Sequence, residues 1–384
     1  MNGGPAKKIL HIVEDLKVGG LEKILASIVL SLDPSKYDPQ VWCLTMGGQV
    51  ADELSKQGIS VRVLGLNGYY NPLRIAELAR MMKKEKFHII HTHGYFAGTF
   101  GRLAAILAGI PVIIAHVHST YHEYGRRNLL IERFLSCFTD RIICISQAVE
   151  RFVTVNEKIR KEKTRLIYNA VTPPDKLIDD SQRKKMRASL GLDAEATVIA
   201  VVASLTANKG HGILLTAFRE IFLSHPSVRL LIVGDGPLRD KLEASARQLM
   251  VDQAVVFTGI RKDVFDLLQI SDIFILPTQV REGLGVALIE AMAVGLPVIG
   301  TGIGGIPELI EEAGNGFLVS PGNSEQLAEA IRMLVDDKAL RTAMGIRGRR
   351  IYEEKFTMSK MKELVETMYD ELLFKIPDKK LNAR

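Results

Sequence analysis

The sequence predicts an α/β protein with two doubly wound parallel sheets, each in a domain of its own. Short apolar runs of strand length alternate with amphipathic runs of helix length, which is typical of parallel sheets covered by helices. One polar segment near the middle of the chain interrupts this alternation. The chain has 384 residues, which is more than one hydrophobic core usually organises.

The first half of the chain alternates regularly between the two kinds of segment. Strands are expected at residues 8–13, 40–45, 61–65, 88–91, 110–115 and 141–145. Helices are expected at residues 21–32, 50–57, 73–84 and 96–107. Because these strands are short, apolar and separated by helices, they are expected to form one parallel sheet.

A polar segment, residues 169–185, separates the two halves and is expected to be a linker. It contains Pro173-Pro174 and lacks the apolar periodicity of its neighbours. The alternation then restarts, with strands expected at 198–204, 229–233, 254–258, 273–276, 298–300 and 317–319. Helices are expected at 212–223, 238–249, 264–269 and 325–335, and a last helix-like run covers 358–374.

The composition indicates a globular protein of the cytoplasm. Hydrophobic residues make up 47% of the chain, yet no apolar run reaches the roughly 18 to 20 residues of a transmembrane helix. The N-terminus does not resemble a signal peptide, because two lysines lead directly into a strand. The three cysteines have neither metal-binding nor redox spacing, so they are expected to be reduced core residues.

The net charge of +6 raises the question of an anionic partner. Nucleic acid is not expected, because no recognition motif is present and aromatic residues are only 6% of the chain. An anionic membrane surface is favoured by segment 126–138, where basic residues accompany Leu129, Leu130, Phe134 and Phe138. The same pattern is equally typical of a half-buried helix with a solvated face, and both interpretations stay open.

Segment 278–297 carries the chemistry of the second half. It runs from a strand through a glycine loop, which contains Glu282, into an apolar helix with Glu290 about two turns from its start. A carboxylate among apolar neighbours requires hydrogen-bond donors, and Glu290 leans toward the loop, as side chains on helices do. Glycines let a ligand approach the backbone, and a helix N-terminus suits a phosphate. The pattern therefore indicates a phosphorylated sugar whose hydroxyls need acceptors.

Further candidates follow other strands and are expected at the carboxyl edges of the two sheets, where ligands bind in such folds. Lys209 lies between a strand and a helix, where its charge can stabilise a diphosphate leaving group. In the first half, His118 and His93 follow strands and are expected to contact substrate. His91 and His116 are expected to be packing residues.

The motifs around these residues resemble those of the GT4 group of retaining glycosyltransferases, which have the GT-B fold. The motifs are Glu-x7-Glu at 282–290, Glu-Gly-x-Gly at 282–285, Glu-Ala-Met-Ala-x-Gly-x-Pro-Val at 290–298, Gly-Gly-Ile-Pro-Glu at 304–308 and Val-Gly-Gly-Leu-Glu at 18–22. The resemblance covers essentially the whole chain. It implies two Rossmann-like domains facing a cleft, residues 1–172 and 173–356, with a C-terminal helix of about 357–384 crossing back to the first.

The resemblance also implies roles for single residues. Lys209 contacts the diphosphate, Glu282 binds hydroxyls of the donor sugar, and Glu290 binds the ribose. Backbone groups that approach the phosphates or the sugar belong to Gly19, Gly20, Gly283, Leu284, Gly285 and Val286. His118 contacts the sugar, and His93 is a candidate on the acceptor side.

The chain departs from the family pattern at Ser204, where the family usually has an arginine that binds the diphosphate. Arg261 or Arg281 is expected to supply the missing charge. No Asp-x-Asp motif occurs in the sequence, and transferases that hold the diphosphate through a divalent ion typically use one. A site without metal or cofactor is therefore expected, with the nucleotide-diphosphate sugar as co-substrate.

Together these features predict a retaining, metal-independent transferase. It is expected to move a hexose-type sugar from a nucleotide-diphosphate sugar, UDP-sugar in first place, to a saccharide or lipid-linked acceptor. Envelope polysaccharide or glycolipid synthesis at the inner face of the cell membrane is the expected setting. Two alternatives stay open: a sugar-nucleotide 2-epimerase on the same architecture, and a non-catalytic protein that binds nucleotide sugars. A dinucleotide dehydrogenase is not expected, because no Gly-x-Gly-x-x-Gly follows the first strand of either half.

Overall fold

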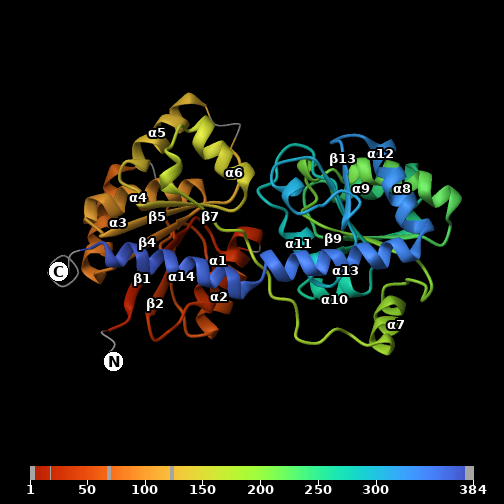
Figure 1. The fold of residues 1–384 in the computed structure, drawn as a ribbon, viewed down its shortest axis with the longest axis horizontal. Helices are drawn as coiled ribbons and strands as arrows, with labels where there is room; N and C mark the ends of the chain where they lie inside the picture. Colours follow the sequence, from red (N-terminus) through yellow and green to blue (C-terminus); the bar gives the residue numbers. More distant parts are fainter. Residues whose placement is uncertain (1–4, 18, 67–70, 122–124, 377–384) are drawn as a thin grey trace. The chain divides into compact units, whose positions relative to one another are not determined.

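The chain folds into two compact units, Met1–Ala170 with Met358–Arg384, and Val171–Thr357. The computed structural model describes residues 5–17, 19–66, 71–121 and 125–376 (Figure 1). Val18 of the glycine motif and the end of the expected C-terminal helix, 377–384, lie outside the described residues. Each unit contains a parallel sheet with helices, which confirms the predicted α/β class.

Among the described residues, the first unit holds a seven-stranded parallel sheet with the order β3-β2-β1-β4-β5-β6-β7. The strands are β1 Lys7–Val13, β2 Tyr37–Cys43, β3 Ser60–Val63, β4 Ile89–His93, β5 Val112–Val117, β6 Arg141–Cys144 and β7 Thr164–Leu166. The order changes direction at β1, which pairs with β2 on one side and β4 on the other. Strand β7, only three residues long, was not predicted.

The helices of the first unit lie between these strands. They are α1 Gly20–Ser31, α2 Gln49–Lys56, α3 Pro72–Glu85, α4 Tyr95–Ala108, α5 Arg126–Ser136, α6 Gln147–Arg151 and the π-helical turn Phe152–Asn156. The last helix, α14 Met358–Phe374, belongs to the same unit and packs against α1 (Figure 1). It is fixed there by polar contacts, in which Tyr37 donates to Asp370 at 2.5 Å and the Asp33 N–H donates to Glu366 at 2.8 Å.

All residues of the second unit are described, and they hold a six-stranded parallel sheet with the order β10-β9-β8-β11-β12-β13. The strands are β8 Val198–Val202, β9 Arg229–Val233, β10 Val255–Gly259, β11 Ile273–Leu276, β12 Val298–Thr301 and β13 Gly316–Val319. The helices are α7 Asp180–Ser189, α8 His211–Ser224, α9 Arg239–Gln248, α10 Val264–Gln269, α11 Val286–Ala293, α12 Ser324–Asp336 and α13 Lys338–Lys355. Buried aliphatic residues such as Ile199, Leu230 and Ile275 form its core.

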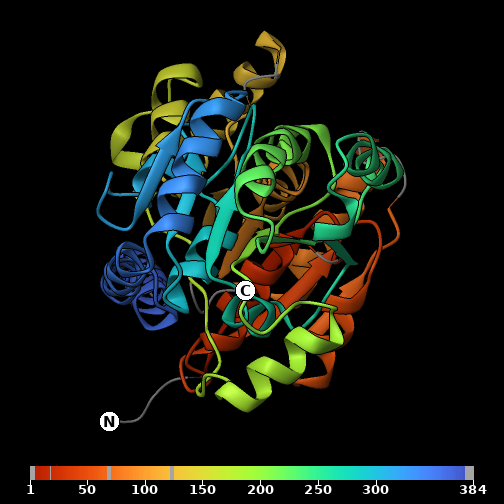
Figure 2. The ribbon, with the colours of Figure 1, turned by 90° about the vertical axis from the view of Figure 1, so that its right-hand side faces the viewer.

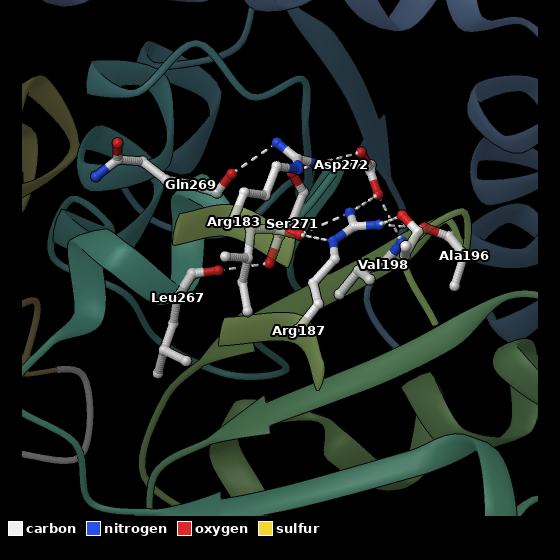
Figure 3. Close-up of polar contacts among 10 residues, drawn as sticks. Arg183, Arg187, Ala196, Val198, Leu267, Gln269, Ser271 and Asp272 are labelled. Carbon is white, nitrogen blue, oxygen red and sulfur yellow. Dashed lines mark hydrogen bonds and ion pairs between the residues drawn. The ribbon is translucent and has the colours of Figure 1, made fainter. Parts of the chain in front are cut away.

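The prediction of a linker at residues 169–185 is wrong for its second half, which begins helix α7. Asp179 caps this helix in a capping box with Gln182. Arg183 and Arg187 of α7 both pair with Asp272 at 2.8 Å, and Arg187 also donates to the carbonyl of Ile270 (Figure 3). Figures 1 and 2 show α7, in yellow-green, at the lower edge of this unit. Polar side chains thus hold a segment that has little apolar surface of its own.

Helix α13 was also not predicted, because two glycines interrupt the helical pattern of its sequence. The structure explains one of them. A Cβ atom at Gly345 would lie 2.0 Å from the carbonyl oxygen of Gly295, so the two backbones approach too closely for any side chain. This approach allows α13 to pack against α11, which carries Glu290.

Candidate functional site

Two loops of the second unit bring Lys209 and Glu282 together. Lys209 ends a 3-10 turn, Ala207–Lys209, that follows β8, and Glu282 lies in the loop after β11. The Lys209 ammonium donates to the Glu282 carboxylate at 2.6 Å, and Thr278 donates to the same oxygen at 3.3 Å. The side chains are 23% and 15% exposed, so the pair is reachable from solvent. Lys209, which is expected at the diphosphate, and Glu282, which is expected at the donor sugar, are therefore in direct contact.

Asn208 fixes the two loops to each other, and the sequence analysis missed it. Its side-chain oxygen accepts from the N–H groups of Val280 and Arg281, both at 3.1 Å, and its amide nitrogen donates to the Arg281 carbonyl at 3.0 Å. The Gln279 N–H donates to its main-chain oxygen at 2.7 Å. An asparagine directly before the lysine was the only signal in the sequence. Its role depends on β8 and β11 being neighbours in the sheet.

Two glycines permit this close approach. Gly210 has a φ of +69°, and a Cβ atom there would lie 1.9 Å from the Pro277 carbonyl oxygen. Gly304 has a φ of +56°, and a Cβ atom there would lie 1.8 Å from the carbonyl oxygen of Glu282. Both positions therefore favour glycine for two reasons: L-residues are strained at positive φ, and there is no space for a Cβ atom. The motif at 304–308 thus supports the backbone of Glu282.

Helix α11 begins at Val286, directly after the buried segment Gly283–Gly285. Gly285 has a φ of +92° and precedes the helix, and its carbonyl oxygen accepts from the N–H of Leu288 at 2.9 Å. Glu290 is partly buried and lies just over one turn into α11, so the predicted position two turns in is wrong by about a turn. This shorter distance places Glu290 nearer the start of the helix.

The arginines expected to replace the charge missing at Ser204 lie in different surroundings. Arg261 forms a two-pronged ion pair with Asp263, at 2.8 and 2.5 Å, which lowers the pKa of that carboxyl. Its charge is thus already matched by a carboxylate of its own loop. The main chain of Arg281 is held by Asn208 beside the Lys209 turn. That Arg261 or Arg281 supplies the diphosphate-binding charge missing at Ser204 stays a prediction.

In the first unit, Gly19 and Gly20 stand at the start of α1. Gly19 precedes the helix in an extended conformation, and a Cβ atom there would lie 2.1 Å from a carboxylate oxygen of Glu22. A side chain at Gly19 would therefore displace Glu22, whose pKa is raised by burial. At Gly20 a Cβ atom would meet nothing within 4 Å. Both glycines lie after β1, at the carboxyl edge of the sheet.

The same edge carries a cluster of histidines that the sequence analysis did not foresee. His11 of β1 pairs in register with His91 of β4, and His93 of β4 pairs with His116 of β5. His118 follows β5, and its Nε2 lies 3.3 Å from Nδ1 of His93. The first four of these side chains are at most 1% exposed. The cluster forms because β1, β4 and β5 are adjacent, which the linear sequence does not reveal.

The histidines are linked to one another and to the C-terminal helix. His11 Nδ1 lies 3.0 Å from His93 Nε2, and His91 Nδ1 lies 2.6 Å from the hydroxyl of Tyr369 on α14. Burial lowers the pKa of His11 and of His118 to about 3, so both rings are neutral at pH 7. His91 and His116, predicted to be packing residues, are indeed buried, but they belong to this polar cluster.

Comparison with known proteins assigns the chain to a family. Residues 182–351 match the family described as Glycosyl transferases group 1, and residues 18–173 match Glycosyltransferase Family 4. The chain belongs to these glycosyltransferases. The first match contains Lys209, Glu282 and Glu290, and the second contains the glycine motif and every histidine of the cluster except His11. The predicted family is therefore confirmed.

Individual relatives agree with this assignment. The putative glycosyltransferase EpsF of Bacillus subtilis is 29% identical over 76% of this chain and 78% of its own length. The UDP-Gal:alpha-D-GlcNAc-diphosphoundecaprenol alpha-1,3-galactosyltransferase of Escherichia coli is 29% identical over 69% of this chain and 71% of its own. HepE of Anabaena, solved in complex with UDP and glucose, is similar with a TM-score of 0.85 at 25% identity, covering 95% and 99% of the two chains. The predicted GT-B fold is thus confirmed for this glycosyltransferase.

Proposed function

We propose that this glycosyltransferase moves a hexose-type sugar from UDP-sugar to a saccharide or lipid-linked acceptor, with retention of the anomeric configuration. The observation that carries the proposal is the Lys209–Glu282 ion pair. It joins a cation for the diphosphate to an acceptor for sugar hydroxyls. The choice of UDP is supported by HepE, solved with UDP and glucose, and by the UDP-Gal enzyme of Escherichia coli. The latter name also supports a lipid-linked acceptor in envelope polysaccharide synthesis.

The chemistry of the donor half follows from charge. Cleavage of the sugar–phosphate bond leaves negative charge on the diphosphate, and a preorganised cation stabilises that charge. Lys209 supplies the cation, and the N–H groups at the start of α11, from Gly283 to Val286, supply further donors. Glu282 accepts from hydroxyls of the sugar and Glu290 from those of the ribose. The absence of an Asp-x-Asp motif from the sequence supports a diphosphate site without metal or cofactor.

The first unit provides groups for the sugar and the acceptor. Gly19 and Gly20 offer backbone to the phosphates, His118 contacts the sugar, and His93 faces the acceptor. Neutral imidazoles suit these tasks, because each ring then has one donor and one acceptor nitrogen. Burial lowers the pKa of His93 well below its ordinary value, which keeps it neutral throughout the physiological range.

We further propose that the first unit contacts the anionic inner face of the cell membrane from the cytoplasm. On and beside helix α5, Leu130, Phe134 and Phe138 are 64%, 59% and 47% exposed. An apolar groove of about 650 Å³ adjoins Leu130 and Phe134, and Arg127 lines it as well. Apolar side chains flanked by arginine fit a bilayer of anionic lipid. Within the described residues, no helix is long and apolar enough to cross a membrane.

Thermal unfolding with nucleotides tests the donor assignment. The purified protein is heated with UDP, GDP or ADP after treatment with EDTA. UDP at about 100 times its Kd should stabilise the folded state by about 2.7 kcal/mol without added metal. For a unit of this size that corresponds to a rise in Tm of roughly 5 to 10 °C. Selective stabilisation by GDP or ADP would show that the donor carries guanine or adenine in place of uracil. A rise in Tm that appears only with magnesium would overturn the proposed metal independence.

Product analysis separates the transferase from its rivals. A transferase releases UDP in proportion to the acceptor glycosylated, and a retaining one conserves the anomeric configuration of the donor. The 2-epimerase would convert the sugar from the donor alone, without any acceptor. A non-catalytic protein would bind UDP-sugar and catalyse neither transfer to an acceptor nor epimerisation of the sugar. An inverted linkage in the product would refute the retaining mechanism.

A further inference from the structure

The histidine cluster contains a group of three that the proposed function does not fully use. His93, His116 and His118 each offer a ring nitrogen, and these three atoms all lie within 4.8 Å of one another. His93 and His118 are assigned to substrate, but His116 has no role beyond filling space. Three imidazoles gathered at one point are the common ligand set of zinc and its neighbours among the transition metals.

The separation of two of the nitrogens already suits a metal ion. His93 Nδ1 and His118 Nε2 are 3.3 Å apart. Two nitrogens held at 2.0–2.1 Å from a tetrahedral Zn²⁺ are about 3.4 Å from each other. The distance between these two nitrogens therefore matches that between two ligands of one ion.

A neighbouring residue orients His93 for this task. His93 Nε2 lies 3.0 Å from His11 Nδ1, so the tautomer protonated at Nε2 donates to His11. That tautomer leaves the lone pair of His93 Nδ1 directed toward His118. Histidine ligands of metals regularly donate their second ring N–H to a partner that fixes the ring in this way.

His116 completes the group and is left unsatisfied without a ligand. It is 1% exposed, and neither of its ring nitrogens has a hydrogen-bond partner among the described residues. Its ring centroid is 4.2 Å from that of His118 and 5.2 Å from that of His93. A buried polar group without a partner is destabilising, and coordination to a metal would offset that cost.

Access and selectivity follow from the position of the group. His118 is only partly buried, so an ion can reach the group from the end of β5. Magnesium and calcium prefer oxygen ligands and do not suit three imidazoles. Three protein ligands leave a fourth tetrahedral position for water.

We propose that His93, His116 and His118 bind one divalent transition-metal ion of the Zn²⁺ class. A bound ion would withdraw His93 and His118 from substrate, so we expect it to inhibit glycosyl transfer reversibly. This second consequence rests on the proposed function, whereas binding of the ion does not.

Binding is tested with the metal alone on the full chain after removal of metal with EDTA. Calorimetric titration with ZnCl₂ should show one tight site per chain. Co²⁺ should give the visible absorption of a tetrahedral site without a thiolate charge-transfer band, which excludes the cysteines as ligands. Absence of a stoichiometric site for both ions would overturn the proposal.

Variants identify the ligands. His116→Leu replaces the imidazole with an apolar side chain of similar size and removes no hydrogen bond within the described residues, so the protein should fold and still be stabilised by UDP. Its affinity for Zn²⁺ should fall by at least about 100-fold. His118→Gln, at a partly exposed position, should have the same effect and serves if His116→Leu does not fold. His225→Gln, in the second unit where His225 pairs with Asp336, is the matched control and should bind Zn²⁺ normally. Unchanged affinity in both cluster variants would refute the site.

Activity separates the two consequences. Zn²⁺ should inhibit transfer by the natural protein, and EDTA should restore it. Zn²⁺ binding without inhibition would refute only the role of the two histidines in transfer. Absence of transfer in the metal-free protein would refute the proposed function. The metal site would still stand if the same protein binds one Zn²⁺ per chain in the titration.

Discussion

At the scale of single residues, the donor site depends on how one charge is held. Lys209 is paired with Glu282 at 2.6 Å in a partly exposed position. Such a pair is moderately favourable in solvent, so a diphosphate with two negative charges competes well for the ammonium. Glu282 then becomes free to accept from sugar hydroxyls. In the proposed mechanism, the ion pair thus holds both side chains where the donor is expected to bind.

Lys209→Ala should chiefly lower kcat. The lysine stabilises charge that develops only as the bond to the diphosphate breaks, so about 10²- to 10³-fold is expected. Steady-state kinetics with UDP-sugar measure the change. Lys262→Ala removes an exposed lysine from the loop after β10 and should leave kcat unchanged. A kcat of Lys209→Ala within twofold of the natural protein would contradict the assignment.

Glu290→Ala should weaken donor binding more than turnover. The hydrogen bonds from ribose hydroxyls to a carboxylate are worth about 1.5–3 kcal/mol, or roughly 10- to 150-fold in Kd. Calorimetric titration with UDP measures this directly. Glu325→Ala, in the first turn of α12, is a matched control with an exposed glutamate. UDP binding by Glu290→Ala as tight as by the control would show that Glu290 does not contact the nucleotide.

At the scale of elements, polar contacts position segments that apolar packing alone would not. Helix α7 has few apolar residues, and its place depends on Arg183 and Arg187 meeting Asp272 (Figure 3). Asp272 also accepts from the Val198 N–H at 2.8 Å, which connects this cluster to the first residue of β8. The same strand leads into the Lys209 turn, so the cluster stabilises the base of the strand that carries the donor site.

Asp272→Asn should destabilise the second unit by about 2–3 kcal/mol. The substitution leaves the Arg187 side chain, which is 4% exposed, without its carboxylate, and Asp272 itself is 23% exposed. Loss of one partner of a buried pair costs about 3–5 kcal/mol, and partial exposure reduces this value. Unfolding by urea measures the difference. Asp193→Asn, whose carboxylate pairs with Arg229 and is 72% exposed, should cost less than about 1 kcal/mol. Equal losses in both variants would contradict the role of the cluster.

Helix α5 carries the membrane prediction. Phe134→Ser removes an exposed apolar side chain beside the groove and should reduce binding to anionic vesicles by roughly 10- to 150-fold, because one large side chain contributes about 1.5–3 kcal/mol. Flotation with vesicles of phosphatidylglycerol and of phosphatidylcholine provides the measurement. Leu223→Ser, at the end of α8 where Leu223 is 69% exposed, is the matched control. Binding that is equal for both lipids, or unaffected by Phe134→Ser, would favour an ordinary surface helix.

At the scale of the whole molecule, burial of ionisable groups in the first unit sets its response to pH. Burial, together with the smaller effect of the neighbouring charge of Glu132, raises the pKa of Glu157 to about 8. Between pH 4.5 and about 8, the Glu157 carboxyl therefore keeps its proton in the folded state and loses it in the unfolded state. The contribution of this group to the free energy of unfolding is therefore most favourable below pH 4.5 and falls as the pH rises from about 4.5 to 8.

Glu157→Gln should remove this pH dependence. The amide cannot ionise, so the first unit should be more stable than the natural protein at pH 8, and the advantage should shrink toward pH 5. Thermal unfolding at a series of pH values gives the comparison. An advantage of about 1–3 kcal/mol at pH 8 is expected. A variant that is less stable than the natural protein at every pH would show that the carboxyl is held by contacts an amide cannot replace.

Much of the fold was predictable because its signals are local. The periodicity of apolar residues located most strands and helices of both sheets to within a few residues. Two of the helices that were missed depend on distant partners. Helix α7 is held by Asp272, and α13 contains a glycine that the backbone at Gly295 requires. A short strand such as β7 has too few residues to show a period.

The sequence by itself determined the family and predicted the residues of the donor site, because Glu282, Glu290 and Lys209 stand in motifs that are read along the chain. The tertiary structure alone decided which of these residues meet. Adjacency of β8 and β11 brings Lys209 into contact with Glu282, and Asn208 holds the two loops together. Adjacency of β1, β4 and β5 gathers the histidines, which are separated by up to 107 residues between His11 and His118. Strand order is a property of the packed sheet, and no local pattern encodes it.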